Sequence, residues 1–320
     1  MNPVYSIIIP VYNRPEEIRE LLGSLKDQRF RSFEVIVVED GSAHTCEAEV
    51  MKFSNDFPVR YFRKQNEGPG PARNFGFREA NGEFLVVFDS DCLIPPGYFE
   101  AVEEFRRSHL VDAWGGPDAG HSSFTPLQQA MAWTMSSWLT TGGIRGKKGA
   151  LDSFQPRSFN MGMSRKVYEA TGGFRFDRYA EDIELSIRMR EAGFSVWLIP
   201  AAFVYHKRRT SLSQFYRQVR NFGRGRVEVA KAHPGTLKIA HWLPLAFTSG
   251  LIVSVVAAVV IPSIGKWMAG MFIVYLLMIF AGALFATGSL TVGLLAMPSV
   301  LVQLSGYARG FVDGLFAKRS

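Results

Sequence analysis

The N-terminal part of the chain alternates between short apolar runs and amphipathic stretches. Apolar runs of strand length, rich in β-branched residues, occur at residues 5–10, 33–38, 59–62 and 84–88. Between the first two runs, Asn13-Arg14-Pro15-Glu16-Glu17 starts a helix that carries Ile18, Leu21, Leu22 and Leu25 on one face. Strand, helix and strand at this spacing predict a βαβ unit with a right-handed crossover. We therefore expect an α/β domain with a mainly parallel sheet.

The run at residues 84–88 is unbroken and ends abruptly in two carboxylates, Asp89 and Asp91. Such a run is typical of a strand buried on both faces, and its carboxyl end lies at the edge where α/β sheets bind ligands. Because the two acids are two residues apart, one turn can aim both at Mg²⁺ or Mn²⁺ held between the protein and substrate phosphates. The alternative is a solvated turn with acidic helix-capping residues.

Two further segments reach the same edge of the predicted sheet. Glu39 and Asp40 end the second strand, where a carboxylate can accept the imide N–H of a uracil ring or a ribose hydroxyl, or only shape the turn. The glycine- and proline-rich segment 66–74 opens a helix. It leaves N–H groups and Arg73 for a diphosphate, or is an ordinary helix entry.

From Trp242 onward, charged residues almost vanish. Residues 242–261 and 267–287 are each long enough to cross the hydrocarbon core, and the short turn 262–266 between them makes them a hairpin. A third stretch, 290–308, is interrupted by Pro298 and Gln303, so it crosses or lies in the interface. We expect one domain over residues 1–235 and a membrane domain over residues 236–320, with two spans and an interfacial third helix.

The net charge of +7 is concentrated largely in the block from Lys207 to Arg226. A basic block beside a membrane segment fits anionic lipid headgroups and the positive-inside rule, and no usual nucleic-acid module is present. We expect residues 205–235 to form a basic interfacial helix and the N-terminal domain to be cytoplasmic. Cys46 and Cys92 lack CxxC spacing, and no cleavable signal is evident, which agrees with that location.

Residues 124–139 are rich in large apolar side chains, which either pack in a core or meet the bilayer interface.

Four motifs in order resemble the family 2 glycosyltransferases, which are inverting enzymes of the GT-A fold that use nucleotide-diphosphate sugars. They are Ser6-Ile-Ile-Ile-Pro-Val-Tyr-Asn13, Val38-Glu-Asp-Gly-Ser42, Asn66-Glu-Gly68 with Ala72-Arg-Asn74, and Asp89-Ser-Asp91. The resemblance covers roughly residues 4–225. Glu39 stands where the family commonly has an aspartate, which leaves its role open.

The resemblance implies roles for individual residues. Donor-binding residues would be Pro10, Tyr12, Asn13, Asp40, Asn66, Gly68, Arg73, Asp89 and Ser90. Asp89 and Asp91 would hold the metal, and His206 either joins them or is a surface histidine among basic neighbours. Residues 179–185 resemble the family's Glu-Asp motif, so Asp182 would be the catalytic base with Glu181 beside it. Taken alone, the motif would be a helix N-terminus decorated with acids.

The sequence therefore predicts a multi-pass inner-membrane, metal-dependent inverting glycosyltransferase. Its donor would be a nucleotide-diphosphate sugar, with a UDP-sugar as first choice. Its acceptor would be a hydroxyl or a lipid-linked saccharide in cell-surface polysaccharide or glycolipid synthesis, or a polyprenyl phosphate. A catalytically silent nucleotide-sugar-binding scaffold is the rival hypothesis, and Asp89, Asp91 and Asp182 together speak against it. Transport is disfavoured because the apolar segment lacks the charged residues of ion pathways.

Overall fold

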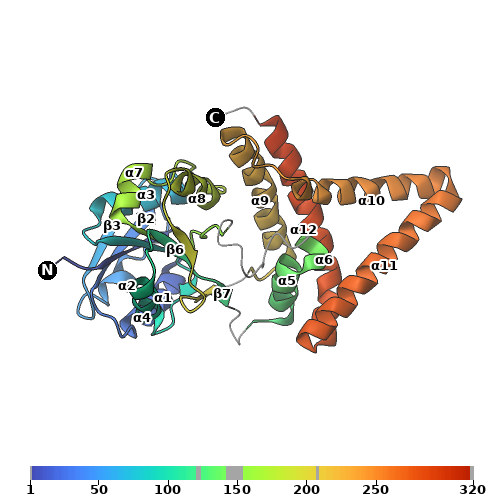
Figure 1. Cartoon of the computed structure of the whole chain (residues 1–320). Helices are drawn as coiled ribbons and strands as arrows, with labels where there is room; N and C mark the ends of the chain where they lie inside the picture. The colour runs from blue at the N-terminus through green and yellow to red at the C-terminus, as the bar shows by residue number, and fades with distance from the viewer. Residues whose placement is uncertain (1, 120–123, 142–153, 207–208, 318–320) are drawn as a thin grey trace. The chain divides into compact units, whose positions relative to one another are not determined.

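The computed structural model describes residues 2–119, 124–141, 154–206 and 209–317 of the chain (Figure 1). The chain divides into two compact units. The first unit comprises residues 1–121 and 150–207, and the second comprises residues 122–149 and 208–320.

The first unit is built on a seven-stranded sheet in the order β3-β2-β1-β4-β8-β6-β9. Its strands are β1 (Tyr5–Val11), β2 (Phe33–Asp40), β3 (Val59–Lys64), β4 (Phe84–Phe88), β6 (Ala113–Gly115), β8 (Asn160–Ser164) and β9 (Val196–Leu198). β1 to β4 pair in parallel, as do β6 and β9, whereas β8 is antiparallel to both β4 and β6. The predicted mainly parallel sheet is confirmed. The antiparallel strand β8 was not predicted, because its sequence Asn-Met-Gly-Met-Ser has no β-branched residue.

Helices cover both faces of this sheet. One face packs against α1 (Pro15–Lys26), α2 (Glu47–Met51) and α4 (Tyr98–Ser108), and the other against α3 (Pro69–Glu79), α7 (Arg165–Thr171) and α8 (Glu181–Glu191). Side chains alternate between the two cores along each central strand, with Ile7 and Ile9 on one side and Ile8 on the other. Two-sided burial explains the unbroken apolar runs in the sequence. The four apolar residues predicted on one face of α1 are all buried.

A smaller sheet forms beside the carboxyl end of β4. It consists of β5 (Cys92–Leu93), β10 (Val204–His206) and β7 (Asp118–Ala119), with β10 in the middle. β10 runs antiparallel to β5 and places His206 opposite Cys92. β10 follows β9 and returns the chain to the residues after β4.

The second unit is helical. It contains α5 (Pro126–Ser136), α6 (Trp138–Thr141), α9 (Leu212–Ala232), the 3₁₀ turn η2 (Ile239–His241), α10 (Leu243–Val260), α11 (Pro262–Thr287) and α12 (Leu290–Phe316). Among the described residues, α10, α11 and α12 are long and apolar enough to cross a membrane. Residues 262–266, predicted as a turn, are instead the first turn of α11, because Pro262 is suited to the start of a helix. The break between α10 and α11 is the single residue Ile261.

The predicted basic helix exists as α9, and it runs beside α12 (Figure 1). Glycines allow the two backbones to approach closely: a Cβ added to Gly310 would lie 1.8 Å from the carbonyl oxygen of Arg220. Because α9 buries its apolar face in this way, it belongs to the second unit, and so do α5 and α6. The division of the chain therefore differs from the predicted boundary at residues 235/236. Residues 207 and 208 of the basic block lie outside the described residues.

The apolar stretch at residues 124–139 packs largely in a core. Met131 of α5 is buried with Phe215 and Val219 of α9, and Ala130 is buried in a cluster with residues of α11 and α12. The core-packing alternative is thus confirmed for these two side chains, whereas Trp138 is 72% exposed.

Candidate active site

The small sheet brings His206 to the carboxylates that follow β4. His206 Nε2 lies 3.1 Å from Asp91 Oδ1, and the imidazole ring stacks on Phe159 at 4.7 Å between ring centroids. Asp91 is buried, whereas the side chain of Asp89 is 32% exposed. The structure therefore places Asp91 and His206 together at the edge where the sequence predicted a metal site.

Asp91 is held in its ionised form by two partners. Burial alone would raise its pKa, but the hydrogen bond and charge of His206 and the charge of Arg14 outweigh burial, so the pKa lies well below its usual range. Arg14 Nη1 pairs with Asp91 Oδ2. Arg14 was not predicted as a site residue, because 77 residues separate it from Asp91 in the sequence.

The donor set around Asp91 fits a divalent cation. Ligand atoms of Asp91, Cys92 and His206 all lie within 4.8 Å of one another. Burial raises the pKa of the Cys92 thiol well above its usual range. The carboxylate of Asp91 and the imidazole of His206 are ligands suited to Mn²⁺ and other first-row ions. The predicted ligand Asp89 is not in this group, and its role at the metal stays a prediction.

Arg73 joins the two sides of the site. Its Nη2 lies 2.8 Å from Asp89 Oδ1 and its Nη1 lies 2.7 Å from Glu181 Oε1, and its side chain is only 3% exposed. The sequence predicted that Arg73 is available for a diphosphate. In the structure its guanidinium pairs with two carboxylates, so it could reach a diphosphate only by leaving one of them. Burial and the nearby charge of Asp182 raise the pKa of Glu181, and Arg73 opposes that shift.

Asp182 lies in the first turn of α8, next to Glu181. Its Oδ1 accepts a hydrogen bond from the backbone N–H of Ile183 at 2.8 Å, and its Oδ2 accepts one from the N–H of Ser158 at 3.3 Å. The residue before the motif, Ala180, has a left-handed backbone conformation with φ of 55°. Non-glycine residues in this conformation carry strain of about 1–3 kcal/mol and cluster at functional sites.

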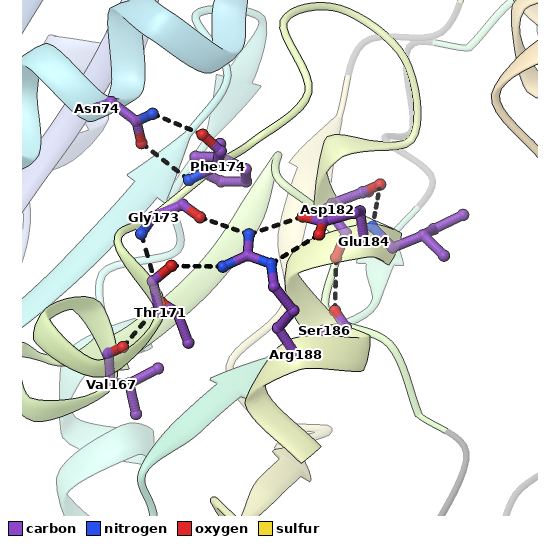
Figure 2. Close-up of polar contacts among 10 residues, drawn as sticks. Asn74, Val167, Thr171, Gly173, Phe174, Asp182, Glu184, Ser186 and Arg188 are labelled. Atoms are coloured by element: carbon purple, nitrogen blue, oxygen red, sulfur yellow. Dashed lines mark hydrogen bonds and ion pairs between the residues drawn. The ribbon is translucent and has the colours of Figure 1, made fainter. Parts of the chain in front are cut away.

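Buried polar contacts fix the segment that leads into α8 (Figure 2). Arg188 forms a two-pronged ion pair with Glu184, at 2.7 and 2.6 Å, and donates to the carbonyl oxygens of Thr171 and Gly173. Asn74 exchanges two hydrogen bonds with the backbone of Phe174. Arg188 and Glu184 were not predicted as site residues, although their spacing of four residues on a helix signals an ion pair. These contacts hold α8 against residues 171–174, and Glu181 at the start of α8 reaches Arg73.

The predicted donor loop is held together mainly by Asp40. Its carboxylate accepts hydrogen bonds from the N–H groups of Glu67 at 3.0 Å and Gly68 at 2.8 Å, and pairs with Lys64 at 3.0 Å. Asn66 donates through its side chain to the carbonyl oxygen of Asp40. These contacts give Asp40, Asn66 and Gly68 a clear role in shaping the loop, and their contact with a donor stays a prediction.

The remaining predicted donor residues lie at the same edge. Asn13 has φ of 53°, and its side-chain oxygen accepts hydrogen bonds from the N–H groups of Ala43 and His44. Tyr12 is 53% exposed, Pro10 is half-buried and Ser90 is buried. Glu39, whose role the sequence left open, is fully buried and accepts hydrogen bonds from the Cys46 N–H and the Tyr61 hydroxyl. Glu39 therefore anchors the turn after β2.

Comparisons with known proteins agree with this architecture. The profile of Glycosyl transferase family 2 matches residues 6–172. The succinoglycan biosynthesis protein ExoA of Rhizobium meliloti is 24% identical over 273 residues, which is 82% of each chain. The putative glycosyltransferase EpsH of Bacillus subtilis is 40% identical over 101 residues, 31% of this chain and 29% of EpsH. An uncharacterized glycosyltransferase of Rickettsia bellii is 43% identical over 89 residues, 28% of this chain and 13% of that protein. Several of these relatives are thus matched over only a small part of their own length.

Two solved structures resemble the chain. The mannosyltransferase PcManGT from Pyrobaculum calidifontis, in complex with GDP-Man and Mn²⁺, matches with a TM-score of 0.61 and 19% identity, over 100% of this chain and 89% of that one. S. aureus TarS 1–349 in complex with UDP-GlcNAc matches with a TM-score of 0.52 and 22% identity, over 74% of this chain and 68% of that one. These similarities confirm the predicted GT-A fold.

Proposed function

Because the chain belongs to glycosyl transferase family 2, we propose that it is a membrane-anchored, metal-dependent inverting glycosyltransferase that moves a sugar from a nucleotide-diphosphate donor to a hydroxyl acceptor. The observation that carries this proposal is a set of ionic contacts at one sheet edge. Arg73 pairs with Asp89 and with Glu181. Asp182 follows Glu181 in the sequence, and Asp91, two residues after Asp89, pairs with His206. A scaffold that only binds a nucleotide sugar has no need of a base.

Each group has a distinct part in this reaction. Asp91 and His206 would hold a divalent ion, which when bound stabilises the departing diphosphate. Asp182 takes the proton from the acceptor hydroxyl as that oxygen attacks the anomeric carbon from the opposite side. The N–H groups of Ile183 and Ser158 orient the Asp182 carboxylate, and Arg73 keeps Glu181 and Asp89 in a fixed relation.

We propose a UDP-sugar as the donor to test first and GDP-mannose as the alternative. The resemblance in motifs favours UDP, whereas the solved structure that matches the whole chain was in complex with GDP-Man. For the acceptor we propose a lipid-linked saccharide or a polyprenyl phosphate in cell-surface polysaccharide or glycolipid synthesis. The apolar helices and the similarity to a succinoglycan biosynthesis protein support this class.

For the membrane part we propose two spans, α10 and α11, and a third helix that lies in the membrane interface. α10 and α11 are mostly exposed, with Val259 81% and Trp267 81% exposed, as lipid-facing helices require. The C-terminal half of α12 instead packs against the charged helix α9, where Arg220 pairs with Asp313 at 2.7 Å.

The length of α12 supports the same proposal. α9 carries Arg217, Arg220 and Arg224 on its exposed face. Placing these charges in hydrocarbon is too costly, so α9 and the part of α12 beside it lie outside the hydrocarbon core. The remaining residues 290–302 would extend about 20 Å as a helix, less than the roughly 30 Å of the hydrocarbon core. With two spans, the C-terminus is on the same side as the catalytic unit, which we place in the cytoplasm at the inner membrane.

The activity can be tested on the full chain in detergent. The wild-type protein is expected to release nucleotide from one of a panel of UDP- and GDP-sugars only when Mn²⁺ or Mg²⁺ is present. Asp91→Asn should abolish this turnover, because it removes the charge of the buried ligand, whereas Asp27→Asn, an exposed acid after α1, should leave it unchanged. Wild-type turnover and metal dependence in Asp91→Asn would refute the metal site.

The topology is tested by a reporter fused after Ser320. We expect a reporter that is active only in the cytoplasm to be active, and one that is active only outside the cytoplasm to be silent. The opposite pattern would require that α12 crosses the membrane as a third span.

A further inference from the structure

Arg14 occupies an unusual position for a residue outside the family motifs. It directly precedes α1, follows the predicted donor residues Tyr12 and Asn13, and reaches across to the Oδ2 atom of Asp91. The second carboxylate oxygen, Oδ1, lies beside His206. Both oxygens of the proposed metal ligand therefore have a partner, and one of these partners is a permanent positive charge.

Arg14 and a metal ion compete for the carboxylate of Asp91. A divalent ion that ligates this carboxylate must share it with a fixed guanidinium charge, and the two cations repel each other. Arg14 can leave, because its side chain is 32% exposed, whereas Asp91 is 7% exposed and held in place. Burial would lower the pKa of Arg14, but the charge and hydrogen bond of Asp91 and the charges of Glu17 and Asp89 outweigh burial, so the guanidinium stays charged.

A diphosphate would give Arg14 a new partner at the same edge. Its planar guanidinium matches phosphate oxygens in two-pronged geometry, and it lies on the segment that the proposed function assigns to the donor. Arg73, the other arginine at this edge, is only 3% exposed and is held by Asp89 and Glu181. Arg14 is therefore the better placed of the two to change partners.

We propose that Arg14 couples metal binding to donor binding by exchanging Asp91 for the donor diphosphate. This inference rests on the proposed function, since it assumes that Asp91 is a metal ligand and that the donor carries a diphosphate. Before the donor arrives, Arg14 competes with the metal for Asp91 and weakens metal binding. When metal and diphosphate enter together, Arg14 leaves Asp91 and pairs with phosphate oxygens. Each ligand thus strengthens binding of the other by the same factor, as linkage requires.

The exchange can be measured without turnover. Free Mn²⁺ is followed by electron paramagnetic resonance during titration of the full chain in detergent, alone and with saturating UDP or GDP. The variants are Arg14→Gln and the matched control Arg19→Gln, an exposed arginine on α1 itself. Because a hydrogen bond between charged partners is worth roughly tenfold in an equilibrium constant, Arg14→Gln is expected to bind Mn²⁺ alone about tenfold more tightly than wild type.

The second expected result is a weaker coupling in the variant. The factor by which UDP or GDP tightens Mn²⁺ binding should fall in Arg14→Gln and remain at the wild-type value in Arg19→Gln. Unchanged or weaker Mn²⁺ binding by Arg14→Gln would overturn the proposal, as would an undiminished coupling factor. Absence of Mn²⁺ binding by both wild type and Arg14→Gln would overturn it as well.

Asp91→Asn separates this failure from failure of the proposed function. If wild type and Asp91→Asn bind Mn²⁺ equally, the metal site itself is misassigned. If Asp91→Asn loses Mn²⁺ and Arg14→Gln is unchanged, the metal site stands and only the exchange by Arg14 is refuted. Thermal unfolding of each variant in detergent shows whether it is folded.

Discussion

In the first unit, buried charged side chains pair with one another, whereas in the second unit no Asp, Glu, Lys or Arg among the described residues is fully buried. In the first unit Arg73 pairs with the buried Glu181 and the partly exposed Asp89, and Arg188 pairs with the buried Glu184. In the second unit the helices α9 and α12 approach each other through Gly223, Gly306 and Gly310. Ion pairs and glycine contacts both bring parts of the chain close together, but only the charged side chains can transfer protons or bind charged ligands.

The difference follows from what each unit must do. Burying ions is costly and stabilises a fold little compared with apolar packing, so a cluster of buried ion pairs at one sheet edge indicates a functional site. The helices of the second unit expose large apolar side chains along α10 and α11, where an apolar solvent requires no polar partners.

The largest effect is expected at Asp182. Asp182→Asn keeps the size of the side chain but removes the proposed proton acceptor, so turnover should fall by about 10²–10⁴-fold with donor affinity nearly unchanged. The control is Asp177→Asn, an exposed acid five residues earlier in the same segment, which should retain activity. Steady-state kinetics with the identified donor provides the measurement. Equal losses in rate and donor affinity would mean that Asp182 is structural.

The next effect tests the buried ion pairs themselves. Arg73→Gln leaves the carboxylates of Asp89 and Glu181 without their cation, which should destabilise the chain by about 3–5 kcal/mol. Arg78→Gln, at an exposed position of α3, should change stability by less than about 0.5 kcal/mol. Urea unfolding in detergent compares the two. A similar stability for both variants would show that the ionic network has little structural role.

A smaller effect is expected from the glycine contacts of the second unit. Gly310→Leu drives a side chain into the backbone of Arg220, and we expect a loss of about 1–3 kcal/mol, seen as a lower Tm in detergent. Gly270→Leu on α11 meets no atom within 4 Å of its Cβ and should leave the Tm unchanged or raise it. If both variants behave alike, α9 and α12 are not packed as closely as the structure shows.

The smallest effect concerns the one alanine in the left-handed region at the site. Ala180→Gly should stabilise the chain by up to about 1 kcal/mol, because glycine adopts the φ of 55° without strain. Ala192→Gly, at the other end of α8 with φ of −81°, should be neutral or destabilising. Opposite signs for the two variants in urea unfolding would confirm stored strain before Glu181. A destabilised Ala180→Gly would contradict it.

Local patterns in the sequence were sufficient for much of the molecule. Apolar runs and helix starts predicted β1, β2, β4 and α1, because two-sided burial and helix periodicity leave direct marks on neighbouring residues. Length and lack of charge likewise predicted α10 and α11. The motif Asp89-Ser90-Asp91 directly follows an apolar run of strand length, so the sequence also predicted carboxylates at the carboxyl end of β4.

Which of these residues meet depends on how the whole chain folds. The partners of Asp91 are Arg14 and His206, which lie far from it in the sequence and reach it through the start of α1 and the pairing of β10 with β5. Arg73 pairs with Asp89 and also with Glu181, which lies 108 residues after Arg73 in the chain. Likewise, the composition of residues 212–232 signals a charged helix, but its packing on α12 depends on glycines nearly a hundred residues away. Side-chain periodicity reports which face of an element is buried and carries no information about what covers that face, so these partners followed from the fold alone.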